Sequence, residues 1–118
     1  VDTGTAYLLC PECGLKPIQM DAVRGTRDDS TALINVFTGR PARGKVNRFA
    51  RELGLIDPEA PQFPLPAANL APLRTKAEAE GLADFAYALF GQSAPLAQPI
   101  PAGELTRALA ADALRRLK

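Results

Sequence analysis

Apolar residues recur at helical spacing in the middle of the chain. The stripe is formed by Val46, Phe49, Ala50 and Leu53. These positions follow the i, i+3, i+4, i+7 rule for one face of a helix. Pro41, a residue suited to the first helical turn, precedes the stripe, and Gly54 follows it. The pattern therefore predicts a helix over residues 41–54 that buries this face.

Four further segments are predicted to be helical. They span residues 17–24, 69–80, 84–96 and 102–117. The first two are followed by glycine, which is common just past a helix C-terminus. The inward positions are assigned to Leu70, Leu73 and Ala77 in the second, to Phe85, Leu89 and Phe90 in the third, and to Leu105, Leu109, Ala113 and Leu117 in the last.

Two segments have the composition of short strands. Residues 31–38 are rich in β-branched and aromatic side chains, and residues 1–7 are small and reach a turn at Gly4 and Thr5. Residues 55–66 contain four prolines and are predicted to be an extended connector. The chain is therefore predicted to be mainly α with one or two short β segments, in one domain of residues 1–118.

Charge adds little to this picture, because Lys and Arg number 14 and Asp and Glu number 13, for a net charge of +1. A nearly neutral chain has no long-range field that would attract nucleic acid or an anionic membrane. There is no run of about 18 apolar residues and no signal-peptide pattern. We therefore expect no nucleic-acid or membrane partner, and a cytoplasmic location.

Cys10 and Cys13 form a Cys-x-x-Cys pair, which is a pattern found in zinc and redox sites. A closed zinc site needs four ligands, and the chain has no His and no other Cys. A thioredoxin-like pair would stand at a helix N-terminus in a βαβ unit, which the sequence does not predict. Incidental thiols are therefore favoured over redox activity, and no metal is expected.

A basic face accompanies the central apolar stripe. It comprises Arg40, Arg43 and Arg51, with Lys45 and Arg48 beside them. Nucleic-acid binding is disfavoured, because the domain is not basic and no aromatic residues are interleaved for stacking. The choice between a solvated face and an anion site stays open, with the solvated face favoured.

The string Phe-Thr-Gly-Arg-Pro-Ala-Arg-Gly-x-x-Asn-Arg, at residues 37–48, resembles a signature of the nitronate monooxygenases, formerly called 2-nitropropane dioxygenases. Further strings agree in order, at residues 4–12, 63–65, 71–74, 91–94 and 104–107. The resemblance covers nearly the whole chain but only the last third of such an enzyme. It implies the C-terminal part of a flavin-binding (β/α)8 TIM barrel, with residues 1–10 as the last barrel strand and phosphate turn and residues 11–118 as a helical cap region.

The resemblance also implies site residues. Gly4 and Thr5 are expected to hold the phosphate of FMN, although a Gly-Thr pair alone fits any turn equally well. Gly91 and Gln92 are expected to lie against the flavin, although Phe90 stands where a small residue is typical. A third group, Thr38, Gly39 and Arg40, is expected to shape the mouth of the active site.

The function that the resemblance implies is the oxidation of alkyl nitronates with dioxygen to carbonyl compounds and nitrite, with FMN as cofactor. The catalytic His of such enzymes is absent, so residues 1–118 alone are expected to be inactive. An N-terminal barrel part or another chain is expected to cover the apolar surface. The alternative is a free-standing small helical protein that binds a partner and catalyses nothing.

Overall fold

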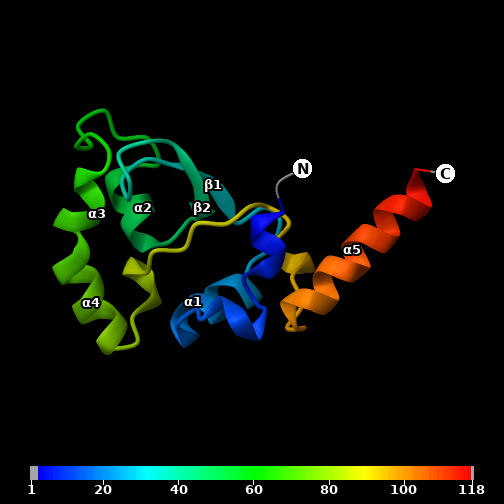
Figure 1. The fold of residues 1–118 in the computed structure, drawn as a ribbon. Helices are drawn as coiled ribbons and strands as arrows, with labels where there is room; N and C mark the ends of the chain where they lie inside the picture. The colour runs from blue at the N-terminus through cyan, green and yellow to red at the C-terminus, as the bar shows by residue number, and fades with distance from the viewer. Residues whose placement is uncertain (1–2, 118) are drawn as a thin grey trace.

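The computed structural model describes residues 3–117, which form short helices around a small antiparallel hairpin (Figure 1). The α-helices are α1 (Pro17–Arg24), α2 (Arg48–Leu53), α3 (Leu65–Asn69), α4 (Ala71–Ala79) and α5 (Ala102–Arg116). The strands are β1 (Thr31–Ile34) and β2 (Ala42–Lys45), and the 3-10 turns are η1 (Gly4–Tyr7), η2 (Pro11–Cys13), η3 (Ala83–Phe85) and η4 (Ala94–Leu96). This confirms a mainly α chain with short β segments.

The hairpin is extended by a third segment of backbone, residues 86–91. Strand β1 pairs with β2, with Thr31 opposite Lys45 and Ile34 opposite Ala42. On the other side of β2, Lys45 N–H donates to Ala88 O at 2.9 Å, and Phe90 N–H donates to the carbonyl of Arg43 at 3.1 Å. A Cβ on Gly44 would lie 2.7 Å from Ala88 O, so only glycine permits this close approach.

Two apolar clusters flank this hairpin. The first gathers Leu9, Ala22, Val23, Ala88, Phe90 and Ala94, which joins the N-terminal turns to α1 and η4. The second gathers Ile34, Val36, Phe37 and Ala50, with Phe49 and Tyr87 packed against them. The Phe37 and Phe49 rings lie 5.3 Å apart and the Phe37 and Tyr87 rings 5.8 Å apart, distances typical of favourable aromatic pairs. Residues 86–91 contribute to both clusters and connect them.

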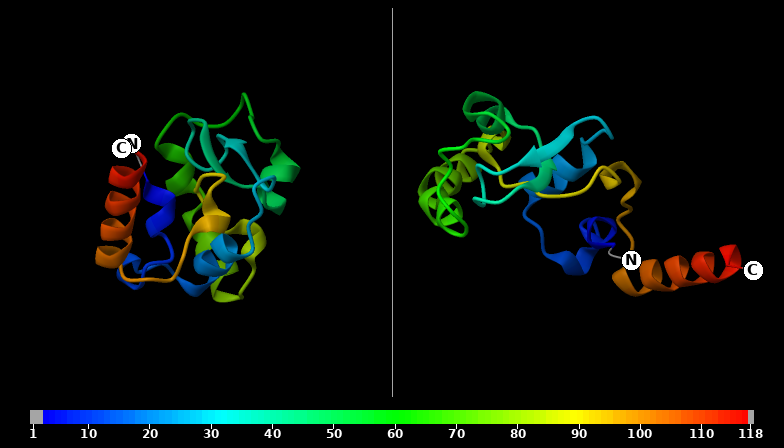
Figure 2. Two further views of the ribbon diagram at one scale, coloured as in Figure 1. Left: turned by 90° about the vertical axis from the view of Figure 1, so that its right-hand side faces the viewer. Right: turned by 90° about the horizontal axis from the view of Figure 1, so that it is seen from above.

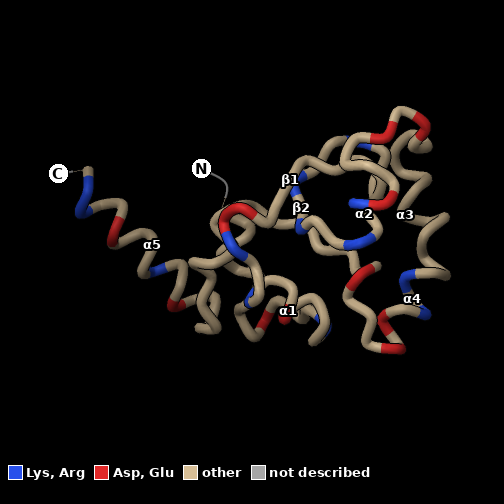
Figure 3. The backbone as a smooth tube through the Cα atoms, turned by 180° about the vertical axis from the view of Figure 1, so that it is seen from behind, with Lys and Arg blue, Asp and Glu red and all other residues tan. Residues whose placement is uncertain are grey.

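The molecule is elongated, with extents of 49 × 29 × 24 Å. Helices α3 and α4 lie at one end, and α5 projects from the body at the other (Figures 1 and 2). Lys and Arg are interspersed with Asp and Glu along much of the backbone, whereas residues 40–51 carry Lys and Arg alone (Figure 3). Among residues 3–117, no helix is long and apolar enough to cross a membrane.

The helix predicted over residues 41–54 is wrong in its first half. Residues 42–45 are strand β2, because their backbone groups pair with β1 and with residues 86–91. The helix begins only after Asn47, whose Oδ1 accepts the Ala50 N–H at 3.0 Å in a regular N-cap. Of the predicted buried stripe, Ala50 is fully buried, whereas Leu53 is 51% exposed.

The helix predicted over residues 84–96 is also wrong. Its middle is extended because its backbone bonds to β2, and only η3 and η4 at its ends are helical. The turn predicted at Gly4 and Thr5 is present as η1, which closes through local bonds such as Ala6 N–H to Thr3 O at 3.2 Å, so residues 4–7 are not part of a strand. Val1 and Asp2 lie outside the described residues, so the last barrel strand stays a prediction.

Candidate functional site

Two of the predicted cofactor-binding pairs meet in space. The Oγ1 of Thr5 accepts a hydrogen bond from the backbone N–H of Gly91 at 2.9 Å, across 86 positions of sequence. A Cβ on residue 91 would lie 3.4 Å from that same Oγ1, an ordinary van der Waals distance. The turn η1 and the segment after residue 90 are thus in contact.

The Thr5–Gly91 contact borders a surface hollow. Its lining consists of Thr3, Gly4, Thr5, Ala6, Gly91 and Ser93. A Thr hydroxyl carries one hydrogen and two acceptor positions, so Thr5 can still donate outward while it accepts from Gly91. Small residues with hydroxyl donors suit the oxygens of a phosphate group. None of these described lining residues is charged, so they match one neutral side of a phosphate site.

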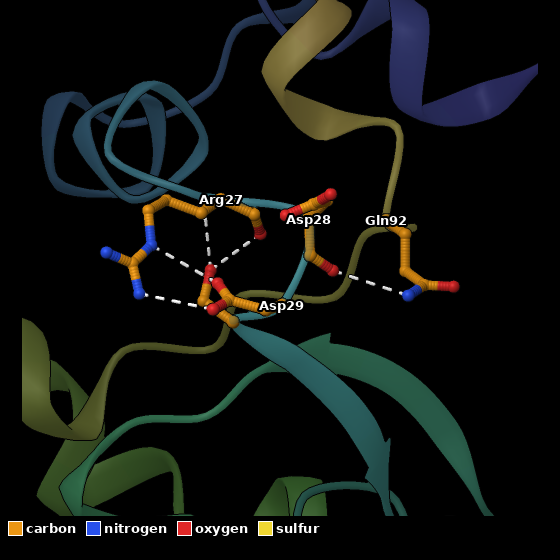
Figure 4. Close-up of polar contacts among 5 residues, drawn as sticks. Arg27, Asp28, Asp29 and Gln92 are labelled. Atoms are coloured by element: carbon orange, nitrogen blue, oxygen red, sulfur yellow. Dashed lines mark hydrogen bonds and ion pairs between the residues drawn. The ribbon is translucent and has the colours of Figure 1, made fainter.

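Gln92 takes a different position. Its Nε2 donates to the backbone carbonyl of Asp28 at 3.3 Å (Figure 4). The same turn carries an ion pair between Arg27 and Asp29, with an N–O distance of 3.2 Å. The Gln92 side chain therefore ties residues 27–29 to the segment after Gly91 and is not part of the hollow's lining.

The predicted mouth residues form a tight turn of their own. Thr38 Oγ1 donates a hydrogen bond to Arg40 O at 2.8 Å and accepts one from the backbone N–H of Arg40 at 3.3 Å. Gly39 has φ +84°, and the Arg40 guanidinium lies 5.1 Å from the centre of the Phe63 ring. Gly39 and Arg40 thus pack against residues 61–63, and Thr38 closes the turn by its bonds to Arg40. A role at the active-site mouth stays a prediction.

The two cysteines are free thiols in unlike environments. Cys10 is buried and 4% exposed, whereas Cys13 is exposed. Burial raises the pKa of the Cys10 thiol, and the negative charges of Glu12 and Cys13 raise it further. Within residues 3–117 no group of three or more His, Cys, Asp or Glu side chains is placed to hold a metal ion.

Sequence reasoning missed the residues that anchor helix α5. Both carboxylate oxygens of Glu12 lie 3.1 Å from the backbone N of Ala102, the first residue of α5. One turn further on, the hydroxyls of Tyr7 and Thr106 are 2.8 Å apart. The start of α5 accordingly lies beside the N-terminal turns (Figure 1). No local pattern could reveal contacts across 90 and 99 positions.

Comparison with known proteins agrees with the resemblance. The sequence model described as "Nitronate monooxygenase" matches residues 1–112. The nitronate monooxygenase of Pseudomonas aeruginosa is 39% identical over 110 residues, which are 92% of this chain and 31% of that protein. A probable nitronate monooxygenase of Staphylococcus saprophyticus is 33% identical over 89% of this chain and 30% of its own length.

Two solved structures superpose on the chain. The nitroalkane oxidase from Streptomyces ansochromogenes gives a TM-score of 0.80 at 39% identity, over 92% of this chain and 31% of its own. FabK from Thermotoga maritima gives a TM-score of 0.62 at 20% identity, over 97% of this chain and 38% of its own. This likeness supports the fold alone. Both are TIM-barrel proteins, so the predicted fold class is confirmed.

The chain spans about a third of the length of these relatives. The family match nevertheless runs from the first residues through most of α5, and it includes the hollow at Thr5 and Gly91. The chain belongs to the nitronate monooxygenase family.

Proposed function

We propose that this chain forms the C-terminal section of an FMN-dependent enzyme that oxidises alkyl nitronates with dioxygen to carbonyl compounds and nitrite. The observation that carries the proposal is the hydrogen bond between Gly91 N–H and Thr5 Oγ1, at 2.9 Å. It joins the two segments expected to contact the cofactor, in a chain that belongs to the nitronate monooxygenase family.

The residues of the hollow have distinct tasks in this proposal. Gly4 and Thr5 hold the cofactor phosphate, with the Thr5 hydroxyl as donor, and Gly91 lets the cofactor approach the backbone closely. Gln92 acts indirectly, because its bond to Asp28 O positions the segment that carries Gly91. Bound FMN would supply the electron transfer between substrate and dioxygen. The protein's part is to orient the nitronate and to hold that phosphate.

The remaining parts of the enzyme lie outside residues 1–118. The chain contains no His, so the catalytic base expected for such an enzyme belongs to another segment. The hollow's neutral lining also leaves the phosphate charge to be balanced from elsewhere. We therefore propose that the 118 residues alone bind FMN weakly and oxidise no nitronate.

A chimaera tests this proposal. The matching section of the Pseudomonas aeruginosa relative is replaced by this chain, and bound flavin and nitrite production are measured. We expect the chimaera to bind flavin and to produce nitrite. Thr5→Val should weaken FMN binding at least tenfold, because a hydrogen bond to a charged group contributes about 1.5–3 kcal/mol. Thr5→Ser keeps the hydroxyl, and Thr75→Val on α4 is the remote control. A folded chimaera without flavin would refute the proposal.

The second candidate is a free-standing protein that binds a partner through apolar surface. Helix α5 and the residue after it favour it, because Leu109, Leu114 and Leu117 are 39%, 65% and 83% exposed. The two candidates differ in one measurement. If the chimaera binds no flavin and the isolated chain forms a stable complex with a separate protein through α5, the second candidate stands.

A further inference from the structure

Residue 91 is a glycine that the fold itself does not require. Gly91 does not have a positive φ. A Cβ there would lie 3.4 Å from Thr5 Oγ1 and 3.9 Å from Ser93 Oγ, which are ordinary van der Waals distances. An alanine would therefore meet neither backbone strain nor a clash. Because residue 91 is glycine, the point that lies close to both hydroxyls is left open.

The hydroxyl of Ser93 has no task within the described part of the chain. Ser93 is the N-cap residue of η4, but its side chain makes no capping hydrogen bond. Its Oγ has no other hydrogen-bond partner among residues 3–117 either. The side chain is exposed, so its hydroxyl is free to donate to a ligand.

The backbone on both sides of Ser93 is fixed. The Gly91 N–H is bonded to Thr5 Oγ1, and the Ala94 N–H donates to Gly91 O at 3.1 Å. Ala94 is 2% exposed and belongs to the first apolar cluster. The Leu96 N–H donates to Ser93 O at 2.9 Å. The Ser93 hydroxyl is thus held beside Thr5 before any ligand binds.

The hydroxyls of Thr5 and Ser93 lie within reach of one ligand group. Both residues line the same hollow, which has a volume of about 440 Å³. Both oxygens lie within 4 Å of one point, the position of a Cβ on residue 91. Hydrogen bonds between oxygens span about 2.7–2.8 Å, so a group with several acceptor oxygens at this point can accept from both hydroxyls. A tetrahedral phosphoryl group carries such oxygens.

We propose that Ser93 is a second hydroxyl donor to the cofactor phosphate and makes the site selective for FMN over riboflavin, which lacks that phosphate. This inference rests on the proposed function and adds to it a residue and a selectivity. Thr5 and Ser93 donate to different oxygens of one phosphoryl group, and Gly91 leaves the space that this group occupies. The selectivity arises from hydrogen bonding, because none of the described lining residues is charged.

Calorimetry of flavin binding to the chimaera tests the role of Ser93. FMN and riboflavin are each titrated into the flavin-free protein. We expect Ser93→Ala to weaken the affinity for FMN about tenfold and to leave the affinity for riboflavin unchanged, because only FMN carries the phosphate. Ser93→Thr keeps a hydroxyl and should retain most of the FMN affinity. Thr75→Ala, which removes an exposed hydroxyl from α4, should change neither affinity.

Gly91→Ala is an independent variant. Its methyl group would fill the point close to both hydroxyls without straining the empty fold. We therefore expect the melting temperature of the flavin-free chimaera to stay the same, while the affinity for FMN falls at least tenfold. Unchanged FMN affinity in a folded Gly91→Ala chimaera would overturn the placement of the phosphate beside Ser93.

The outcomes separate this inference from the proposed function. A folded chimaera that binds neither flavin overturns both. If the chimaera binds FMN, and Ser93→Ala weakens both flavins equally or weakens neither, the proposed function stands and the role of Ser93 is overturned. Should the chimaera not fold, an NMR titration of the 118-residue chain decides the question. Shifts of the Gly91 and Ser93 amides with FMN alone support the inference, and shifts with both flavins or with neither overturn it.

Discussion

Glycine at position 39 meets two separate requirements. Its φ of +84° is a conformation that L side chains rarely adopt. In addition, a Cβ there would lie 2.4 Å from both Phe63 N and Pro61 O, which are backbone atoms that cannot turn aside. The turn at residues 38–40 therefore depends on glycine for packing as well as for backbone conformation.

This difference can be measured with two alanine variants. Gly39→Ala is expected to lower the free energy of unfolding by about 3 kcal/mol or more, since strain and a backbone clash add. Gly14→Ala is the matched control, because Gly14 has φ +68° with nothing within 4 Å of a Cβ. Gly14→Ala should lower the free energy of unfolding by only about 1 kcal/mol. Urea unfolding compares them, and equal losses would contradict the packing argument.

The two thiols should differ in reactivity. The thiolate is the reacting species, so the raised pKa and burial of Cys10 slow its alkylation relative to Cys13. Mass spectrometry after brief iodoacetamide treatment should show Cys13 modified first, and urea should abolish the difference.

The raised pKa of Cys10 also predicts a pH dependence of stability. The folded state keeps the Cys10 proton, so the free energy of unfolding is expected to fall as the pH rises through the thiol's ordinary pKa of 9.0. A Cys10→Ser variant should lose that dependence.

At the scale of elements, local signals succeeded where the backbone bonds are local. Helix α1 is bounded by Pro17 and Gly25 as predicted. The helices predicted over residues 41–54 and 84–96 are wrong over residues 42–45 and 86–91, because these two segments bond to each other across the sequence, whereas α2 lies in the second half of the first prediction. Helical spacing of apolar residues did not distinguish them, because both segments also bury side chains in the two clusters.

The same limit applies to the candidate site. Gly4, Thr5 and Gly91 were found through resemblance to a family, and their contact spans 86 positions. The Gly-Thr pair by itself would fit any turn. Glu12 had no signal for its task, because a carboxylate that caps a distant helix leaves no periodic trace near itself.

Glu12 provides an element-scale prediction. Its carboxylate accepts from the first N–H of α5 and is favoured there by the helix dipole, so Glu12→Ala should cost about 1 kcal/mol. The loss should be local, seen as faster hydrogen exchange in the first turns of α5. Glu12→Gln keeps an acceptor and should lose less. Glu80→Ala, an exposed residue after α4, should change nothing, and equal exchange in all variants would contradict the prediction.

On the scale of the whole molecule, α5 is the least covered of the described α-helices. None of its described residues is buried, although Leu105 and Leu109 lie on the predicted apolar stripe. The relatives are about three times as long as this chain, so the remainder of such a protein is the expected cover for this face.

That expectation predicts behaviour of the isolated chain. Leu109→Gln combined with Leu117→Gln should lower its binding of a hydrophobic dye and its self-association in sedimentation, without loss of stability, because both side chains are exposed. Leu33→Gln, at a leucine that is 50% exposed on β1, is the control. In the chimaera, the same double variant should instead lower stability. Equal dye binding by the parent chain and the double variant would show that the dye does not bind to the exposed leucines of this region.

The contacts of the first turns also affect how the protein is made. Thr5, Tyr7 and Glu12 have their partners at residues 91, 106 and 102. During synthesis these turns leave the ribosome before their partners, which follow roughly 5–20 s later at about 5–20 residues per second. The N-terminal turns therefore cannot reach their final arrangement while the chain is being extended. A ribosome stalled before residue 91 would hold a nascent chain whose hairpin can form but whose candidate site cannot.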